Sequence, residues 1–429
     1  MSEPAEARSS IRAVRAWAFY DFANSAFATT VMAGFFPTFF KQYWNAGVDA
    51  TVSTGRLGVA NAIAGLVVAI LAPVLGAIAD RGGARKKLLL VFTVIGAAAT
   101  AALYLIGQPH WSVAAAMFVT ASVGFMAANV FYDALMLDVA NDRELDRVSA
   151  LGFALGYLGG GLLFALNLLM VVRPHWFNLA TAADAVRASF LTVALWWLLF
   201  SIPLAVWVRE HKGAPLPIKT AVRQGFAELG ATVRTVIRYR EAVVFLLAYW
   251  FYIDGVNTII KMAVDFGLAI GLEASDLLGA LLLTQFVAFP AAMFFGWLGG
   301  RIGSRNGVLV ALAGYVVANV SAYFIDTSLG FVILAVLIGL VQGGVQSLSR
   351  SLFARLVPQG KNAEFFGFYN MMGKFATVLG PALVALVGWL THSNRAAILS
   401  LLLLFVMGAA ILLKIPNRVV QATSASVAR

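Results

Sequence analysis

The stretch GAIADRGGAR at residues 76–85 recurs in modified form as GWLGGRIGSR at residues 296–305. The first glycine, an arginine, a later glycine and a final arginine align between the copies at a constant offset of 220 residues. A weaker echo pairs Gly152-Phe153 with Gly367-Phe368. Self-similarity at fixed spacing indicates repeated structural units. The sequence therefore predicts two related halves, each with a short glycine- and arginine-containing loop between long apolar stretches.

The composition around these loops is that of a membrane protein. Of 429 residues, 61% are hydrophobic and 12% are charged, and the mean hydropathy is +0.85. A soluble domain is about 25% charged. The chain has no cysteine and only four histidines, none of them four residues from another. This excludes disulfides, thiolate metal sites and iron–sulfur clusters, so we expect no metal and no cofactor.

Long apolar stretches predict an all-α membrane protein with twelve transmembrane helices, because about 20 apolar residues cross a bilayer as a helix. The predicted spans are residues 17–41, 55–79, 87–107, 111–138, 148–172, 187–208, 242–267, 275–299, 307–325, 329–350, 364–390 and 395–414.

Basic residues give this bundle an orientation. Of the 31 lysines and arginines, 24 fall on the side of the N-terminus, 5 on the opposite side and 2 inside spans. The larger group includes Arg350, at the end of the tenth span, and Arg355, which follows it. Basic loops stay in the cytoplasm, so both termini are predicted to be cytoplasmic. The same distribution argues against nucleic acid as the partner of this basic chain.

The longest interior polar stretch divides the chain at its midpoint. We expect residues 1–208 to form one six-helix bundle, 242–429 a second bundle, and 209–241 a cytoplasmic linker. The linker contains two prolines and seven basic residues. Its part at 222–240 fits an amphipathic helix on the membrane surface, and it fits a flexible basic loop equally well.

The repeated loop resembles the signature loop of the major facilitator superfamily, which implies that fold and alternating access between two bundles. The second copy departs from the family pattern, because Gly300 stands where an acidic residue is preferred. The residues predicted to form a cytoplasmic gate are Asp80, Arg81, Arg85, Arg301 and Arg305.

Four further stretches resemble the vacuole-effluxer family, a branch that includes fungal exporters of amino acids from vacuoles. They are WAFYDFANSAFATTV at 17–31, YIDGVNTII at 252–260, GLVQGGVQSLSRS at 339–351 and AEFFGFY at 363–369. The resemblance covers nearly the whole chain and implies efflux of an amino acid or a related small solute.

Polar side chains inside apolar spans are costly in a bilayer and are therefore candidates for function. They occur at helical spacing in spans one, four, seven, ten and eleven. Capping, mutual neutralisation or hydrogen bonds between helices would explain them without a role in transport. The candidates for substrate binding or proton coupling are Asp21, Asn24, Asn129, Asp133, Asp254, Asn257, Lys261, Gln342, Gln346, Asn370 and Lys374.

The sequence as a whole predicts a secondary transporter rather than an enzyme. We expect it to move a small polar solute, an amino acid in the first instance, with a proton as coupling ion. Its expected place is the bacterial plasma membrane, or a vacuolar membrane in a eukaryote. A carrier for a drug, a peptide or an organic anion is the main alternative. A channel is a weaker one, because a channel does not need paired gate loops.

Overall fold

The structure is a computed structural model that describes residues 10–210, 236–269, 272–358, 360–376 and 379–416. These residues are helical and contain no strands. The side chains of Arg81 and Lys374 lie outside the described part. Residues 211–235, the greater part of the predicted linker, also lie outside it. In a bilayer each backbone N–H and C=O needs a partner within the protein, and long apolar helices meet this requirement.

Helices α1 to α7 form the N-terminal set. The first is followed without interruption by two π-helical segments, η1 and η2, with a short helix between them. The bounds are α1 Ile11–Ala26, η1 Phe27–Phe35, α2 Phe36–Phe39, η2 Phe40–Trp44, α3 Ala50–Gly82, α4 Arg85–Ala102, η3 Leu103–Leu105, α5 Trp111–Val139, α6 Leu145–Val172, η4 Pro174–Phe177 and α7 Ala182–Trp207.

Helices α10 to α17 form the C-terminal set. Their bounds are α10 Arg240–Ala269, α11 Ala274–Ile302, α12 Ser304–Ala322, α13 Ser328–Leu356, α14 Asn362–Phe375, α15 Leu379–Thr391, α16 Asn394–Leu399 and α17 Leu402–Leu412. Within the described residues, nine helices of the two sets are long and apolar enough to cross a membrane. The count of twelve spans and the orientation of the termini remain predictions.

Two boundaries differ from those expected. The stretch 364–390, predicted as one span, is divided between α14 and α15. Helix α13 continues to Leu356, beyond the predicted end of the span at residue 350, so Arg355 also belongs to the helix. Arg350 and Arg355 count among the basic residues on the predicted cytoplasmic side, and both are paired with carboxylates inside the protein.

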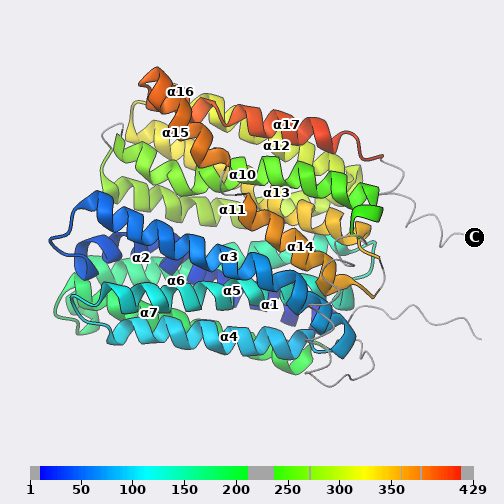
Figure 1. Ribbon diagram of the computed structural model, residues 1–429, viewed down its shortest axis with the longest axis horizontal. Helices are drawn as coiled ribbons and strands as arrows, with labels where there is room; N and C mark the ends of the chain where they lie inside the picture. The colour runs from blue at the N-terminus through cyan, green and yellow to red at the C-terminus, as the bar shows by residue number, and fades with distance from the viewer. Residues whose placement is uncertain (1–9, 211–235, 270–271, 359, 377–378, 417–429) are drawn as a thin grey trace, which may run out of the picture.

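The two sets lie side by side with their helices roughly along the long axis of the molecule (Figure 1). Helix α3 packs on α14, and α6 packs on α11 and α13. We call the end with residues 83–84, 140–144 and 360–361 the inner end, because it is the end predicted to be cytoplasmic. It lies at the right of Figure 1, and the opposite end is the outer end.

The repeated glycines explain how closely the two sets approach each other. A Cβ atom added to Gly76 on α3 would overlap the backbone carbonyl of Ala363 at the start of α14. One added to Gly296 on α11 would overlap the side chain of Ala150 on α6. Gly76 and Gly296 occupy equivalent places in the repeat. The same residue type therefore allows close contact at both interfaces between the sets.

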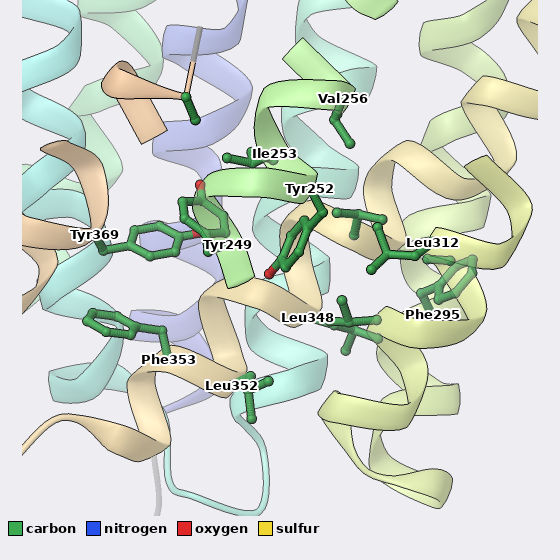
Figure 2. Packing of buried hydrophobic residues seen from close by; sticks show 14 of the residues in the cluster. Tyr249, Tyr252, Ile253, Val256, Phe295, Leu312, Leu348, Leu352, Phe353 and Tyr369 are labelled. Atoms are coloured by element: carbon green, nitrogen blue, oxygen red, sulfur yellow. The ribbon is translucent and has the colours of Figure 1, made fainter. Parts of the chain in front are cut away.

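Aromatic and aliphatic side chains fill the core of the C-terminal set (Figure 2). Tyr249 of α10 stacks on Tyr369 of α14, with ring centroids 4.4 Å apart. Tyr369 also stacks on Phe353 of α13, at 5.2 Å. The buried hydroxyl of Tyr252 lies 2.7 Å from Oγ of Ser349, which gives both groups a partner in the apolar core. Helices α10, α13 and α14 are thus joined near the inner end.

Candidate functional site

A buried guanidinium, that of Arg350, lies where the two sets meet. Arg350 is on α13 of the C-terminal set and is only 2% exposed. Its Nη1 lies 3.1 Å from Oδ1 of Asp133 on α5 and 3.8 Å from Oδ2 of Asp21 on α1. Its Nε and Nη2 donate to Oγ and the backbone oxygen of Ser149 on α6, at 2.9 and 2.8 Å. Asp21, Asp133 and Arg350 are called the central charge cluster.

Aromatic rings surround the guanidinium that these contacts hold. Its central carbon lies 5.0 Å from the ring of Trp17, 5.3 Å from that of Tyr132 and 4.2 Å from that of Phe153. A cation over aromatic faces is favoured, more so when it is desolvated. A Cβ atom on Gly152 would stand 2.9 Å from Nη2 of Arg350. The glycine therefore leaves the space that the arginine fills.

The two carboxylates have further partners from both sets. Asn370 of α14 donates to Oδ2 of Asp133 at 2.9 Å. Ser25 donates to Asp21 at 3.2 Å, and Tyr132 donates to it at 3.4 Å. Asp133 is thus bound by α13 and α14 of the opposite set, whereas Ser25 and Tyr132, which donate to Asp21, belong to its own set. Two buried carboxylates thus share one buried guanidinium.

Predicted polar residues continue from this cluster along the interface. Asn24 donates to Oδ1 of Asn129 at 2.7 Å, joining α1 to α5. Tyr157 of α6 donates to Oε1 of Gln346 on α13 at 2.6 Å, which joins the two sets. Gln342, one turn further along α13, is buried.

Three of the predicted residues lie on α10, away from the central charge cluster, and a fourth lies on α14. Asp254 is fully buried and accepts from the backbone N–H groups of Leu379 and Gly380 at 2.9 and 3.0 Å. Asn257 donates to the backbone oxygen of Ala376 at 3.0 Å. Lys261 is exposed and is not part of the central charge cluster. Lys374 lies on α14, but its side chain is outside the described part.

The inner end carries the contacts of the first repeat copy. The carboxylate of Asp80 on α3 accepts from the backbone N–H groups of Ala363 and Glu364 on α14, at 3.0 and 2.8 Å. A carboxylate is favoured at the positive N-terminus of a helix. Arg85 binds Asp80 at 2.9 Å and Asp138 at 2.6 Å within its own set. Burial raises the pKa of Asp80, although Arg85 and the two N–H groups act in the opposite direction.

The second repeat copy has a different source of negative charge. Gly300 stands where the acid is expected, and among the described residues a Cβ built on it would meet no atom within 4 Å beyond its own stretch of helix. Asp146 at the start of α6 supplies a carboxylate at this interface instead. It is bound by Arg355 and by the hydroxyls of Ser304 and Ser351. The acid comes from the N-terminal set in both copies.

The two predicted arginines of the second copy make contacts within their own set. Arg301 lies over the ring of Trp297, with its guanidinium carbon 4.3 Å from the ring centre. Arg305 donates to the backbone oxygen of Leu413. In the described part of the chain, the inner contacts between the sets include those of Asp80 with the start of α14 and of Asp146 with Arg355.

Sequence reasoning missed Asp146, Arg350 and Arg355. A signal for Arg350 was present, because Gln342, Gln346 and Arg350 are spaced four residues apart and share one helix face. Arg350 was instead counted with the cytoplasmic charge at the end of the tenth span. No comparable signal marks Asp146, since an acid at a helix start is common for reasons of the helix dipole alone.

An all-helical membrane bundle with these interfaces has the fold of major facilitator transporters. It superposes on the human organic anion transporter MFSD10 with a TM-score of 0.69 and 16% identity, over 96% of this chain and 100% of that one. It superposes on the transporter FucP in the outward conformation with a TM-score of 0.72 and 11% identity, over 95% and 99%. Identities this low show the fold alone.

The sequence places the chain within that superfamily. The family model described as vacuole effluxer Atg22 like matches residues 57–421, and the chain belongs to this family. It is 40% identical over 406 residues to the uncharacterized MFS-type transporter YxiO of Bacillus subtilis, covering 94% of each chain. It is 30% identical over 290 residues to autophagy-related protein 22 of Yarrowia lipolytica, covering 61% of this chain and 48% of that one. The protein is a multi-pass membrane transporter and not an enzyme.

Proposed function

We propose that this transporter moves a small polar solute by alternating access and couples the movement to a proton. The observation that carries the proposal is the contact of Arg350 with Asp133 at 3.1 Å, because it joins the two sets through charged groups inside the bundle. Opening of the inner end would separate α13 and α14 from α5. That movement has to break this contact and the bond from Asn370 to Asp133.

Breaking a buried ion pair leaves uncompensated charge, which costs about 3–5 kcal/mol. A proton bound to Asp133 would remove the charge that Arg350 leaves behind. Asp133 lies inside the bundle and its carboxylate exchanges partners when the sets separate, which suits a proton or the amino group of a solute. Protonation and separation of the sets are thereby linked.

We propose an amino acid as the solute and export from the cytoplasm as the direction. The family description, vacuole effluxer, supports export, and acidic and amide groups at the interface suit a zwitterion. The bacterial relative supports a plasma membrane location. In this proposal the two six-helix bundles, residues 1–208 and 242–429, rock about the interface between them. The alternative solutes are a drug, a peptide or an organic anion, and the same transport measurement with each of them in place of the amino acids would test them.

The test is transport by the purified protein in liposomes loaded with radiolabelled amino acids. We expect saturable exchange across the membrane and net movement driven by a pH gradient. Asp133→Asn keeps the shape of the side chain and removes its charge, so it should retain exchange and lose the response to the gradient. Asp184→Asn, an exposed carboxyl at the start of α7, is the matched control. Wild-type protein that exchanges amino acids without responding to any pH gradient would refute proton coupling.

A further inference from the structure

A break divides one predicted membrane helix into α14 and α15. Helix α14 ends at Phe375 and α15 begins at Leu379. Ala376 has φ −74° and ψ 50°, which is not helical. Pro381 is the third residue of α15, where its missing N–H is tolerated, but its ring prevents an unbroken helix through this point. A break inside a membrane span leaves backbone groups without helical partners.

Two side chains of α10, one turn apart, satisfy backbone groups on both sides of this break. The carboxylate of Asp254 accepts from the N–H groups of Leu379 and Gly380 at the start of α15. The amide of Asn257 donates to the carbonyl of Ala376 at 3.0 Å and to that of Gly373 at 3.5 Å, at the end of α14. The acceptor Asp254 thus binds the N–H groups at the N-terminus of α15, and the donor Asn257 binds the carbonyl groups at the C-terminus of α14.

The space around these contacts fits them closely. A Cβ atom on Gly380 would overlap Oγ1 of Thr258 and stand 2.8 Å from Oδ1 of Asp254. Thr258 in turn donates to Oδ1 of Asp254 at 3.3 Å. Only glycine at residue 380 allows the carboxylate to reach the N–H groups of α15.

The part of the helix before the break carries the contacts with the N-terminal set. Helix α14 presents its first N–H groups to Asp80 and its Asn370 to Asp133. It packs mainly on α3 and α5 of the N-terminal set, whereas α15 packs on α16 and α10 of its own set. The angle at the break therefore decides where α14 meets Asp80 and Asp133.

We infer that Asp254 and Asn257 are positioning residues that hold the break between α14 and α15, and that Asp254 does not carry the transported proton. This inference rests on the proposed function only where it refers to transport. Asp254 acts on the central charge cluster indirectly, by fixing the helix that brings Asn370 to Asp133. The break between α14 and α15 is thereby held at one fixed position in the C-terminal set, and we call it the joint.

The direct test measures the bend at the break. The chain has no cysteine, so spin labels at Lys361→Cys, before α14, and Trp389→Cys, near the end of α15, report one distance across the break. We expect Asp254→Ala and Asn257→Ala to shift or broaden this distance distribution. Asp254→Asn keeps one acceptor oxygen and should give a smaller change. Asp276→Asn, an exposed acid on α11, should leave it unchanged.

Transport gives a second and separate readout. For Asp254→Asn we expect exchange and gradient-driven movement to fall together, by about tenfold, as for a displaced binding site. Exchange retained with loss of gradient-driven movement would identify Asp254 as a proton carrier and overturn the inference. An unchanged distance in Asp254→Ala and Asn257→Ala would also overturn it.

The two proposals fail separately. The distance needs no substrate, so it tests the joint even if amino acids are not transported. Should Asp254→Ala fail to fold, Gly380→Ala provides the distance test, because its added Cβ displaces the same carboxylate.

Discussion

Arg355 donates two hydrogen bonds to the carboxylate of Asp146, from Nη1 to Oδ1 at 2.9 Å and from Nη2 to Oδ2 at 3.0 Å. Two parallel bonds between a guanidinium and a carboxylate are stronger and more directional than a single contact. Arg355 lies in the last turn of α13 of the C-terminal set, and Asp146 lies in the first turn of α6 of the N-terminal set. Together with the contact between Asp80 on α3 and the start of α14, this pair closes the inner end in the present conformation.

Removal of Asp146 should favour opening of the inner end. Asp146→Ala leaves Arg355 without its buried partner, a change that costs the closed state about 3–5 kcal/mol. We expect cysteines at the inner ends of α6 and α13 to react faster with a water-soluble thiol reagent. The exchange Asp146→Arg with Arg355→Asp restores opposite charges and should recover part of the protection. No recovery and no change in reactivity would show that the pair does not hold this end closed.

Arg350 should not be replaceable by lysine. Its guanidinium binds Ser149 through Nε and Nη2 and Asp133 through Nη1 at the same time, and a single ammonium lacks this planar geometry. We expect Arg350→Lys to lower the thermal unfolding temperature in detergent and to reduce transport more than tenfold. Asn370→Ala, which removes one neutral donor to Asp133, should have a smaller effect on both. Equal transport by Arg350→Lys and wild type would contradict this role.

Gly76 should be intolerant of any side chain, in contrast to another glycine of the same helix. A methyl group at Gly76 would meet the carbonyl of Ala363, whereas nothing lies within 4 Å of a Cβ on Gly65. Overpacking costs about 1–3 kcal/mol. Because the contact exists when the inner end is closed, this cost destabilises the closed state relative to the open one. Gly76→Ala should therefore raise the proportion of molecules open at this end, as measured by spin-label distances between α3 and α14. Gly65→Ala should behave like wild type.

Acidification on the inner side should favour the closed inner end through Asp80. Burial raises the pKa of Asp80 in the closed state, and hydration after opening would return it towards the usual value. The closed state therefore binds a proton at Asp80 more tightly and becomes less favoured as the pH rises through that raised pKa. The same α3–α14 distances, measured against pH, test this. Asp80→Asn should remove this component, and a slope of opposite sign would contradict it.

The helices could be predicted from the sequence because hydrophobic stretches of the required length leave few other structures in a bilayer. The break after Phe375 was missed, although Gly380 and Pro381 are a local signal for it. The surrounding residues are apolar, and apolarity alone does not distinguish one span from two half-helices. The partners that make the break tolerable, Asp254 and Asn257, lie more than a hundred residues away in the sequence.

The candidate site was predictable in its types of residue more than in its pairings. Asp21 and Asp133 were singled out because a charge inside a span is costly, and the structure brings both to Arg350. Asp254 was singled out for the same reason, but it meets backbone N–H groups instead. Periodicity shows which face of a helix a residue occupies. It does not show which helix that face meets.

The polar contacts between the two sets in the described residues lie in the inner half of the helices, from Tyr157 and Gln346 to Asp146 and Arg355. A solute approaching from the inner side would reach Arg350 and Asp133 only after these polar contacts had ruptured. Their rupture should then set the rate of entry from that side. Such a barrier alters only the speed of approach to equilibrium, because the final solute ratio depends on the driving force and not on the path.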